Sequence, residues 1–153
     1  MDASSIPIGE LLPHGPGMTL IDRLVSYDAA RSVAEATVTE RNVFFDGAGV
    51  PAWAGIEYMA QTIAAHAGFA ARLRSVRPSV GFLLGTRAYA SFVDEFPAGA
   101  RLAISVEPQV LDTGFATFKC EIAIDRVVAT AVVSTYEPPA AAIESLRGRT
   151  EGT

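Results

Sequence analysis

The strongest hydrophobic pattern in the chain lies between residues 53 and 73, where apolar side chains recur every three or four residues. This period predicts one apolar face of an α-helix, and Pro51 stands just before it, where a helix start tolerates proline. Alanine supplies much of that face, which favours close packing against a flat surface such as a sheet. The apolar positions are Ile56, Met59, Ala60, Ile63, Ala64, Ala67 and Ala70.

Shorter apolar segments with the composition of β-strands lie on both sides of the predicted helix. Two precede it, at residues 18–27 and 32–39, and four follow it, at residues 79–89, 101–111, 115–124 and 127–136. Turn-forming residues separate them, and the breaks at residues 112–114 and 125–126 are short enough for hairpins. This order predicts an α+β domain over residues 1–137, with an antiparallel sheet wrapped around one helix. Residues 138–153 are expected to form a C-terminal tail.

Composition narrows the class of protein. Half of the 153 residues are hydrophobic and 19% are charged, which is typical of one compact domain. No stretch approaches the roughly 18–20 apolar residues of a membrane span, and the N-terminus lacks the pattern of a secretory signal, so we expect a cytoplasmic protein. The net charge of −5 argues against nucleic-acid binding. One cysteine and two histidines argue against a metal site, and no cofactor is expected.

Four short motifs stand at the joints between the predicted elements. They are Leu11-Leu12-Pro13-His14 with Leu20-Ile21-Asp22-Arg23, Pro51 with Ile56-Glu57-Tyr58-Met59-Ala60-Gln61, Gly81-Phe82-Leu83-Leu84-Gly85, and Phe96-Pro97-Ala98-Gly99-Ala100-Arg101-Leu102. In this order they resemble the hot-dog-fold β-hydroxyacyl-acyl-carrier-protein dehydratases, and the helix start from Gly55 to Gln61 resembles the aryl-polyene-pathway branch of that family. The resemblance extends from residue 11 to about residue 136, which is nearly all of the predicted domain.

The resemblance implies a hot-dog fold and the dehydration of a 3-hydroxyacyl thioester, bound to an acyl carrier protein, to a trans-2-enoyl thioester in fatty-acid or polyene-type biosynthesis. It also implies a homodimer, or a heterodimer with another hot-dog subunit, because sites in this family form between subunits. One feature departs from the family. The family's Gly-His-Phe-Pro-Gly stretch, which holds the expected catalytic base, corresponds here to a shorter connection at residues 44–51 that contains no histidine. Two alternatives therefore stay open: an acyl thioesterase, and a non-catalytic acyl-binding subunit of a heterodimeric dehydratase.

Glu57 is the first candidate catalytic residue, because a carboxyl group in the first turns of a buried helix is costly unless it is used, paired or solvated. Compensation of the helix dipole is its alternative role. Gln61 lies one turn further on the same face, where it can orient Glu57, bind substrate or be an ordinary polar position. His14 is the candidate base, against an alternative as a structural histidine that pins the N-terminal loop. His66 lies nine residues after Glu57, on the opposite face, and is expected to be a hydrogen-bonded core histidine.

Further residues are candidates for binding substrate or carrier. The amides of Trp53, Ala54 and Gly55 at the helix start suit a thioester oxyanion, and Trp53 is expected either to line an acyl tunnel or to be buried in the core. Asp46 is a candidate substrate residue or substitute base in the shortened connection, with turn formation as the alternative. A basic group can dock an acidic carrier protein, or can simply cap the helix and remain solvated. Its members are Arg72, Arg74, Arg77 and Arg87.

Overall fold

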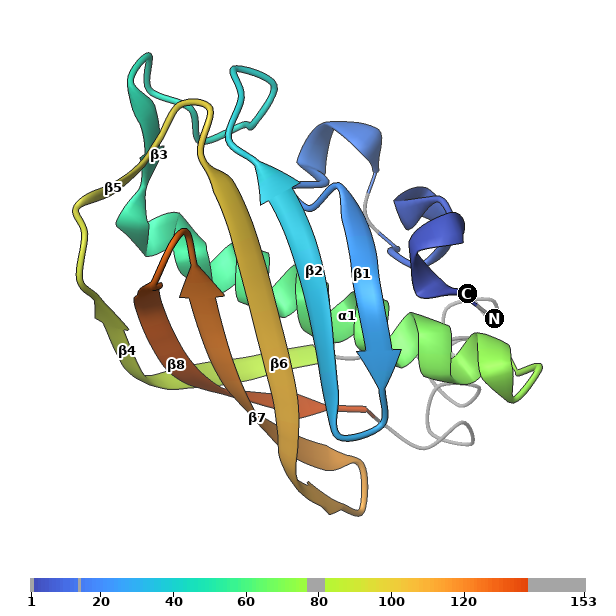
Figure 1. Ribbon diagram of the computed structural model, residues 1–153. Helices are drawn as coiled ribbons and strands as arrows, with labels where there is room; N and C mark the ends of the chain where they lie inside the picture. The colour runs from blue at the N-terminus through green and yellow to red at the C-terminus, as the bar shows by residue number, and fades with distance from the viewer. Residues whose placement is uncertain (1, 14, 77–81, 138–153) are drawn as a thin grey trace, which may run out of the picture.

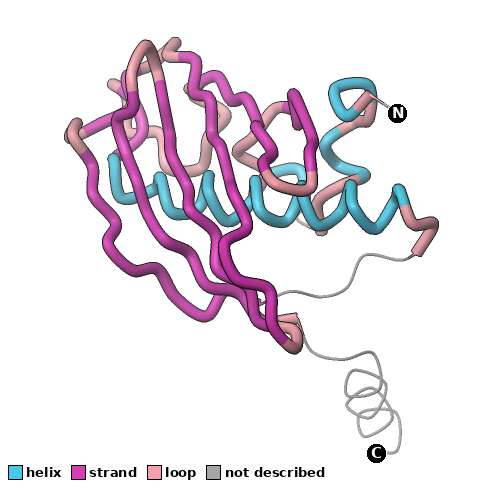
Figure 2. Tube along the Cα trace, turned by 60° about the horizontal axis from the view of Figure 1, so that its bottom comes forward, coloured by secondary structure: helices cyan, strands magenta, loops and turns pink. Residues whose placement is uncertain are grey.

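One α-helix and one large sheet dominate the described part of the chain, residues 2–13, 15–76 and 82–137 of the computed structural model. The helix, α1, runs Gly55–Leu73, and the sheet curves around it (Figures 1 and 2). The strands stand in the order β1-β2-β6-β7-β8-β4, and every neighbouring pair is antiparallel. The predicted α+β architecture of one helix wrapped by an antiparallel sheet is therefore confirmed.

The strands of the large sheet are β1 (Arg23–Asp28), β2 (Arg31–Thr37), β4 (Phe82–Ser91), β6 (Arg101–Asp112), β7 (Phe115–Ala123) and β8 (Val127–Tyr136). A separate two-stranded sheet consists of β3 (Gly49–Pro51) and β5 (Glu95–Pro97). Four short 3₁₀ helices complete the described elements: η1 (Ala3–Ser5), η2 (Ile8–Glu10), η3 (Pro16–Met18) and η4 (Ala52–Ala54). Because η4 leads directly into α1, the helix start is a continuous turn structure from residue 52.

The concave face of the sheet and α1 share one hydrophobic core. Alternate residues of β6, among them Leu102 and Ile104, are fully buried, which is the pattern of a sheet with one face on a core. From the helix, Tyr58, Met59 and Phe69 are almost completely buried against them. Removing a ring such as that of Phe69 from a packed core costs about 3–5 kcal/mol, so this helix face is central to the stability of the fold.

The N-terminal segment crosses the helix at very short range. Leu11 and Leu12 are buried, and the backbone of Leu11 passes over Gly68 of α1. A Cβ at position 68 would lie 2.5 Å from the carbonyl oxygen of Leu11. Glycine at this helix position therefore allows the close approach that holds the N-terminal segment on α1.

The first predicted strand, residues 18–27, is wrong over its first part. Residues 16–18 form η3, which begins with Pro16, and β1 begins only at Arg23. The side chain of Gln61, rather than a strand ladder, bonds to the backbone of Met18 and Leu20. A polar side chain from a distant helix thus satisfies this backbone, and the local apolar pattern carries no sign of that contact.

Other boundaries differ for local reasons. The predicted helix start at residue 53 is a 3₁₀ turn, and the α-helix itself begins at Gly55. The pairing of β3 with β5 was not predicted, because each strand has three residues and one of them in each is a proline. The predicted strand at residues 79–89 begins outside the described residues, and β4 continues to Ser91. Within the described residues, no helix has the length and apolarity needed to cross a membrane.

Candidate functional site

Glu57 is the third residue of α1, and its side chain is partly exposed. The helix presents it in the first turn, where the N-terminal end of the helix dipole favours a negative charge. Gln61, one turn later, donates a hydrogen bond from Nε2 to Glu57 Oε1 at 3.0 Å. The expected same-face pairing of these two side chains is present, and it gives the carboxyl group a defined orientation.

Gln61 is completely buried, and its amide is used on all sides. Besides Glu57, Nε2 donates to the carbonyl oxygen of Met18 at 2.8 Å, and Oε1 accepts from the backbone N–H of Leu20 at 2.7 Å. Both amide hydrogens and the amide oxygen therefore have partners, so the side chain cannot rotate without losing bonds. This network joins the N-terminal segment to Glu57 and fits the orienting role weighed for Gln61.

The connection between β2 and β3 is tied to α1 through a tyrosine. Asn42 Nδ2 donates to the hydroxyl of Tyr58 at 2.7 Å, while Asn42 Oδ1 accepts from the backbone N–H of Phe44 at 2.8 Å. Burial raises the pKa of Tyr58 to about 12, so its phenol stays neutral at physiological pH. The connection that lacks the family's histidine is thus anchored by hydrogen bonds in this fold.

Asp46 forms a turn within this connection. Its Oδ1 accepts hydrogen bonds from the backbone N–H groups of Ala48 and Gly49, both at 3.0 Å, and these bonds hold the pKa of the carboxyl group below its ordinary value. A hydrogen bond with Asp46 raises the pKa of the neighbouring Glu95. The geometry is that of the turn-forming alternative, and it ties the loop before β3 to the strand β5.

Trp53 stands at the helix start with 60% of its surface exposed. Its ring meets that of Phe44 edge to face, with centroids 5.1 Å apart. The alternative of a buried core tryptophan is therefore wrong, because η4 projects this side chain outward from the end of the helix. Ala54 and Gly55 are buried beside it, and the amide of Ala52 is already used in a bond to the carbonyl oxygen of Asp94 at 3.0 Å.

The histidines take separate places. His66 is buried, and its Nδ1 lies 2.6 Å from the hydroxyl oxygen of Ser32, with the ring of Tyr27 5.0 Å away. Burial lowers the pKa of His66. The expectation of a satisfied core histidine is confirmed, since nine residues of helix turn it to the opposite face from Glu57. His14, the candidate base, lies outside the described residues.

The three described arginines of the predicted docking group come from two elements, α1 with its C-cap and β4. Arg72 forms an ion pair with Glu10 at 3.1 Å, and Arg74 is exposed at the end of α1. Arg87 is exposed on β4, and Arg77 lies outside the described residues. At a rise of about 1.5 Å per residue, Arg72 is roughly 22 Å along the helix from Glu57. A carrier docked on Arg72 and Arg74 would therefore contact the far end of the helix.

Other titratable groups do not add to this site. In the described part of the chain, no three His, Cys, Asp or Glu side chains gather closely enough to hold a metal ion. Cys120 is fully buried in β7, and burial raises the pKa of its thiol to about 12. A thiol that stays protonated at neutral pH is a poor nucleophile.

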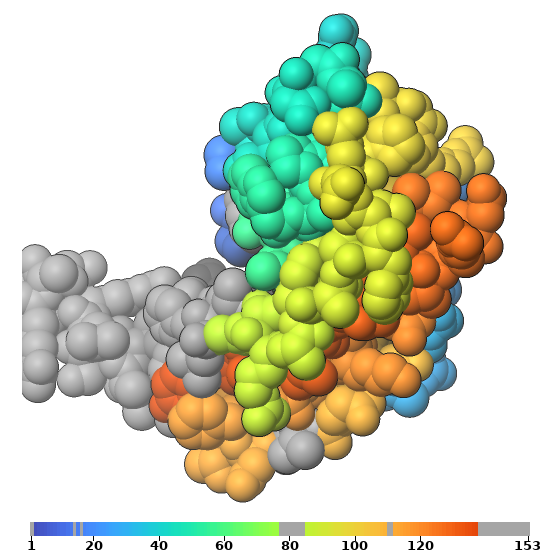
Figure 3. Space-filling view, turned by 90° about the vertical axis from the view of Figure 1, so that its left-hand side faces the viewer, coloured from blue at the N-terminus to red at the C-terminus, as the bar shows by residue number. Residues whose placement is uncertain are grey.

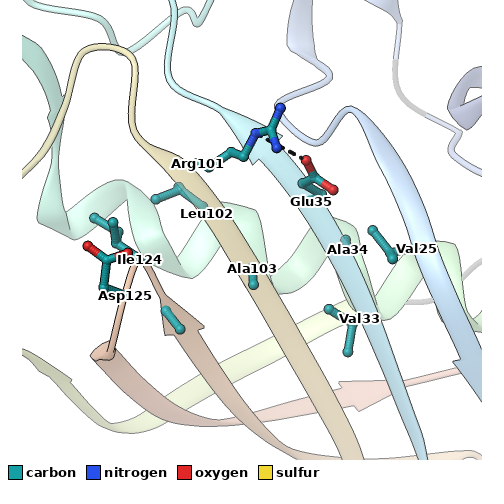
Figure 4. A pocket seen from close by; sticks show the side chains of 10 residues that line it. Val25, Val33, Ala34, Glu35, Arg101, Leu102, Ala103, Ile124 and Asp125 are labelled. Atoms are coloured by element: carbon teal, nitrogen blue, oxygen red, sulfur yellow. Dashed lines mark ion pairs between the residues drawn. The ribbon is translucent and has the colours of Figure 1, made fainter.

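A shallow depression lies on the other face of the sheet from α1 (Figure 4). Its floor is apolar, with Val33 and Ala103 among its residues, and Arg101 pairs with Glu35 at 3.5 Å on its edge. These positions alternate with the buried residues of the same strands, which face the helix. The sheet thus separates this depression from Glu57 and Gln61.

Sequence analysis did not identify Tyr89 as part of the helix start. Its hydroxyl donates a hydrogen bond to the carbonyl oxygen of Ala52, and its ring packs against the core. Residue 89 falls in a segment that reads as a plain strand, and no residue type there marks the β-bulge that aims its side chain. The backbone partners of Gln61 were missed because their segment was predicted to be a strand.

The sequence matches the model of one protein family, and the structure is similar to solved structures. The model of the ApeP-like dehydratase family matches residues 6–146. The ApeI:P dehydratase heterocomplex from Xenorhabdus doucetiae is similar, with a TM-score of 0.83 and 29% sequence identity over 92% of this chain and 97% of that chain.

More distant structures share the fold alone. Zebrafish thioesterase superfamily member 2 has a TM-score of 0.59 and 11% identity, over 76% of this chain and 80% of that chain. The Escherichia coli PaaI protein from the phenylacetic acid degradation operon has a TM-score of 0.56 and 13% identity, over 80% of each chain. No curated protein matches the sequence. Together these neighbours confirm the predicted hot-dog fold.

Proposed function

The chain belongs to the ApeP-like dehydratase family, and from this premise we propose that its substrate is a 3-hydroxyacyl thioester carried by an acyl carrier protein. The dehydratase function and the predicted resemblance to the aryl-polyene branch follow from the family and from the similarity to the ApeI:P complex. The observation that supports the proposed substrate is the partly exposed carboxyl group of Glu57, held in one orientation by the buried amide of Gln61.

In the proposed reaction, a base takes the proton from C2 of the acyl chain and an acid protonates the hydroxyl on C3. The C3–O bond then breaks, water leaves, and the electron pair from C2 forms the C2–C3 double bond of the trans-2-enoyl thioester. Glu57 is the proposed acid, because it is the carboxyl group at the helix start and a positioned acid contributes about 10²–10⁴-fold to such a step. The backbone amides of Trp53 and Ala54 are proposed to face the thioester oxygen, where charge builds up. The amide of Gly55 already donates to the carbonyl oxygen of Ala52 and is not proposed for this role.

The base is proposed to be His14 or a group from a second subunit. The described part of the chain contains one histidine, His66, which is bonded to Ser32 on the opposite face of α1. Asp46 is occupied by its turn and is the weaker candidate for a substrate contact. Comparing His14→Ala with Asp46→Asn would assign the role: the variant that loses about 100-fold or more in kcat carries the base.

A second hot-dog subunit is the proposed partner. The similar ApeI:P assembly is a heterocomplex, and β4 is an end strand of the sheet, with no other described strand on its outer edge. In the space-filling view β4 lies across the surface beside the helix start (Figure 3). Trp53 and Phe92, which are 60% and 66% exposed, stand near the ends of these elements and supply apolar area for a partner. Sedimentation of the chain alone and with a second hot-dog subunit would test this pairing.

Carrier docking is proposed for the exposed arginines Arg74 and Arg87, together with Arg77, because an acidic carrier favours a basic surface. Arg72 is the weaker member, since it already pairs with Glu10. Reversing the charge with Arg74→Glu and Arg87→Glu should raise KM for a carrier-bound substrate. The same changes should leave KM for the corresponding pantetheine thioester unchanged, because that substrate does not contact the carrier surface.

The test of function follows the conjugated enoyl thioester by its ultraviolet absorbance, starting from a 3-hydroxyacyl thioester. Glu57→Gln should lower kcat by about 10²–10⁴-fold if Glu57 is the acid. Glu40→Gln, an exposed glutamate in the connection after β2, is the matched control and should act like the wild type. Thiol release without enoyl formation would identify a thioesterase. A folded chain that is inactive alone and becomes active when a second subunit is added would identify one subunit of a heterodimeric dehydratase.

A further inference from the structure

Tyr89 is a partly buried residue of β4 that reaches the start of the helix. Its hydroxyl donates a hydrogen bond to the carbonyl oxygen of Ala52 in η4. The same hydroxyl lies directly over Gly55, where a Cβ would collide with it. Gly55 is the first residue of α1 and lies two positions before Glu57. The Tyr89 hydroxyl therefore contacts the turn that leads into Glu57, the candidate acid.

A bulge in β4 turns Tyr89 toward the helix. Arg87 pairs with Val132 and Ala90 pairs with Thr130, so β4 has one residue more than β8 between these two pairs. Ala88, inside the bulge, has a φ of 54°, a left-handed conformation that residues with a Cβ seldom adopt. Without the extra residue, strand alternation would place Tyr89 on the exposed face with Arg87. The bulge, which includes the strained backbone of Ala88, therefore directs the Tyr89 side chain toward the helix start.

The hydroxyl holds one end of a peptide unit whose other end is an amide. The carbonyl of Ala52 and the N–H of Trp53 belong to the same planar peptide unit and point in opposite directions when the peptide bond is trans. All peptide bonds in the described part of the chain are trans. The preceding amide, that of Ala52, is taken by Asp94. Trp53 therefore carries the next backbone donor at the helix start. The Ala52 carbonyl also accepts the N–H of Gly55 within the 3₁₀ turn, so two bonds hold this peptide unit, and Tyr89 supplies the one that comes from outside the turn.

We propose that Tyr89 is a positioning residue for the dehydration, which aims the Trp53 N–H at the thioester oxygen by holding the Ala52 carbonyl. This rests on the proposed function. Burial raises the pKa of Tyr89, so the phenol remains a donor at neutral pH. A preorganised amide stabilises the charge that develops in the transition state, and a misdirected one stabilises it less. The hydroxyl should therefore affect kcat more than substrate binding.

The first test is Tyr89→Phe, which keeps the ring and removes the hydroxyl. We expect kcat to fall about tenfold or more, since losing one oxyanion donor outright costs about 10²–10³-fold, while KM stays within about twofold. Trp53 is the chain's single tryptophan, so its fluorescence reports binding of butyryl-pantetheine, an unreactive thioester, at the same place. Its Kd should also be unchanged. Tyr136→Phe, in which the altered tyrosine ends β8, is the matched control.

A second test reads the contact without any activity. Gly55→Ala places a methyl group against the Tyr89 hydroxyl, whereas with Tyr89→Phe the nearest remaining atoms are the ring Cζ and Ile122 Cδ1, both at 3.2 Å. Gly55→Ala should therefore lower the Tm less in the Tyr89→Phe background than in the wild type. Equal losses in both backgrounds would show that the hydroxyl does not lie over Gly55.

The outcomes separate this proposal from the proposed function. An unchanged kcat in Tyr89→Phe, or a rise in KM and Kd with kcat unchanged, would overturn the positioning role. If Glu57→Gln also left the wild-type rate unchanged, the proposed function itself would fail, and the Gly55→Ala comparison would still decide whether the contact exists. If the chain is active only with a partner subunit, the kinetic comparison is made with that complex, so that all variants share one reference.

Discussion

Replacing Gln61 with leucine should damage both stability and activity, because one buried amide serves both. Gln61→Leu keeps the size of the side chain and removes three hydrogen bonds, to Leu20, Met18 and Glu57. Leu20 is only 6% exposed, so its N–H would be left buried and unpaired, at a cost of about 1–3 kcal/mol. Met18 is 49% exposed, and water can replace its lost bond at little cost.

The expected loss of about 1–3 kcal/mol corresponds to a Tm lowered by roughly 3–10 °C for a chain of this size. Urea unfolding would give the free energy directly, since the midpoint should move without a change in slope. For activity, we expect kcat to fall about tenfold or more, yet by less than in Glu57→Gln, because the acid remains but loses its fixed orientation.

Thr62→Val is the control for this experiment. Thr62 is the next residue of α1, is fully buried, and loses only a bond to the carbonyl oxygen of Tyr58 when its hydroxyl becomes a methyl group. It should lower stability by about 1 kcal/mol or less and leave kcat unchanged. If Gln61→Leu and Thr62→Val have the same kcat, the inference that the amide orients Glu57 is refuted.

Three further predictions use other parts of the fold. Because burial lowers the pKa of His66, the unfolded chain binds this proton more readily, and the stability that the neutral ring contributes should be lost as the pH falls below about 6.5. Urea unfolding near pH 7.5 and near pH 5.5 should show a larger fall in the free energy of unfolding for the wild type than for His66→Gln. Equal falls would contradict the assignment. Gly68→Ala should lower the free energy of unfolding, followed by thermal melts, by about 1–3 kcal/mol, because the added Cβ meets the Leu11 backbone. Gly9→Ala, with open space around the added Cβ, should be nearly neutral in the same melts. Asp46→Asn should retain kcat within about twofold, since an asparagine oxygen can accept the same two turn bonds, and a loss of 100-fold in the enoyl assay would instead assign Asp46 to catalysis.

The sequence predicted the features that depend on periodicity. The helical spacing from Ile56 to Ala70 located α1 closely, and the segment at residues 127–136 coincides with β8. These elements each place one continuous face on the core, so local pattern and tertiary packing agree. The predicted neighbourhood of Glu57 and Gln61 rested on the same helical geometry and is present in the structure.

What the sequence could not predict depends on contacts between distant segments. Residues 18–22 are apolar enough for a strand, but Gln61, more than 40 positions away, bonds to the carbonyl of Met18 and the N–H of Leu20. Tyr89 faces the helix only because of an extra residue in β4, and a bulge has no signature in a run of ordinary strand residues. The exposure of Trp53 likewise follows from the direction in which η4 leaves the sheet, which hydrophobicity alone does not determine.

The pairing of β2 with β6 has a consequence for how the chain is made. Ser32 stands opposite Val106 and Thr37 opposite Arg101, so the first hairpin can join the sheet only after more than 60 further residues, the helix among them, have been synthesised. Contacts this distant in sequence carry a large closure entropy and slow the folding of a domain. We expect the meander β6-β7-β8 to form early and the β1-β2 hairpin to dock last, an order that pulsed hydrogen exchange during refolding would reveal. Until then the apolar face of the hairpin is exposed to solvent. During synthesis or after heat shock, this N-terminal quarter is therefore the part of the chain from which aggregation is expected to start.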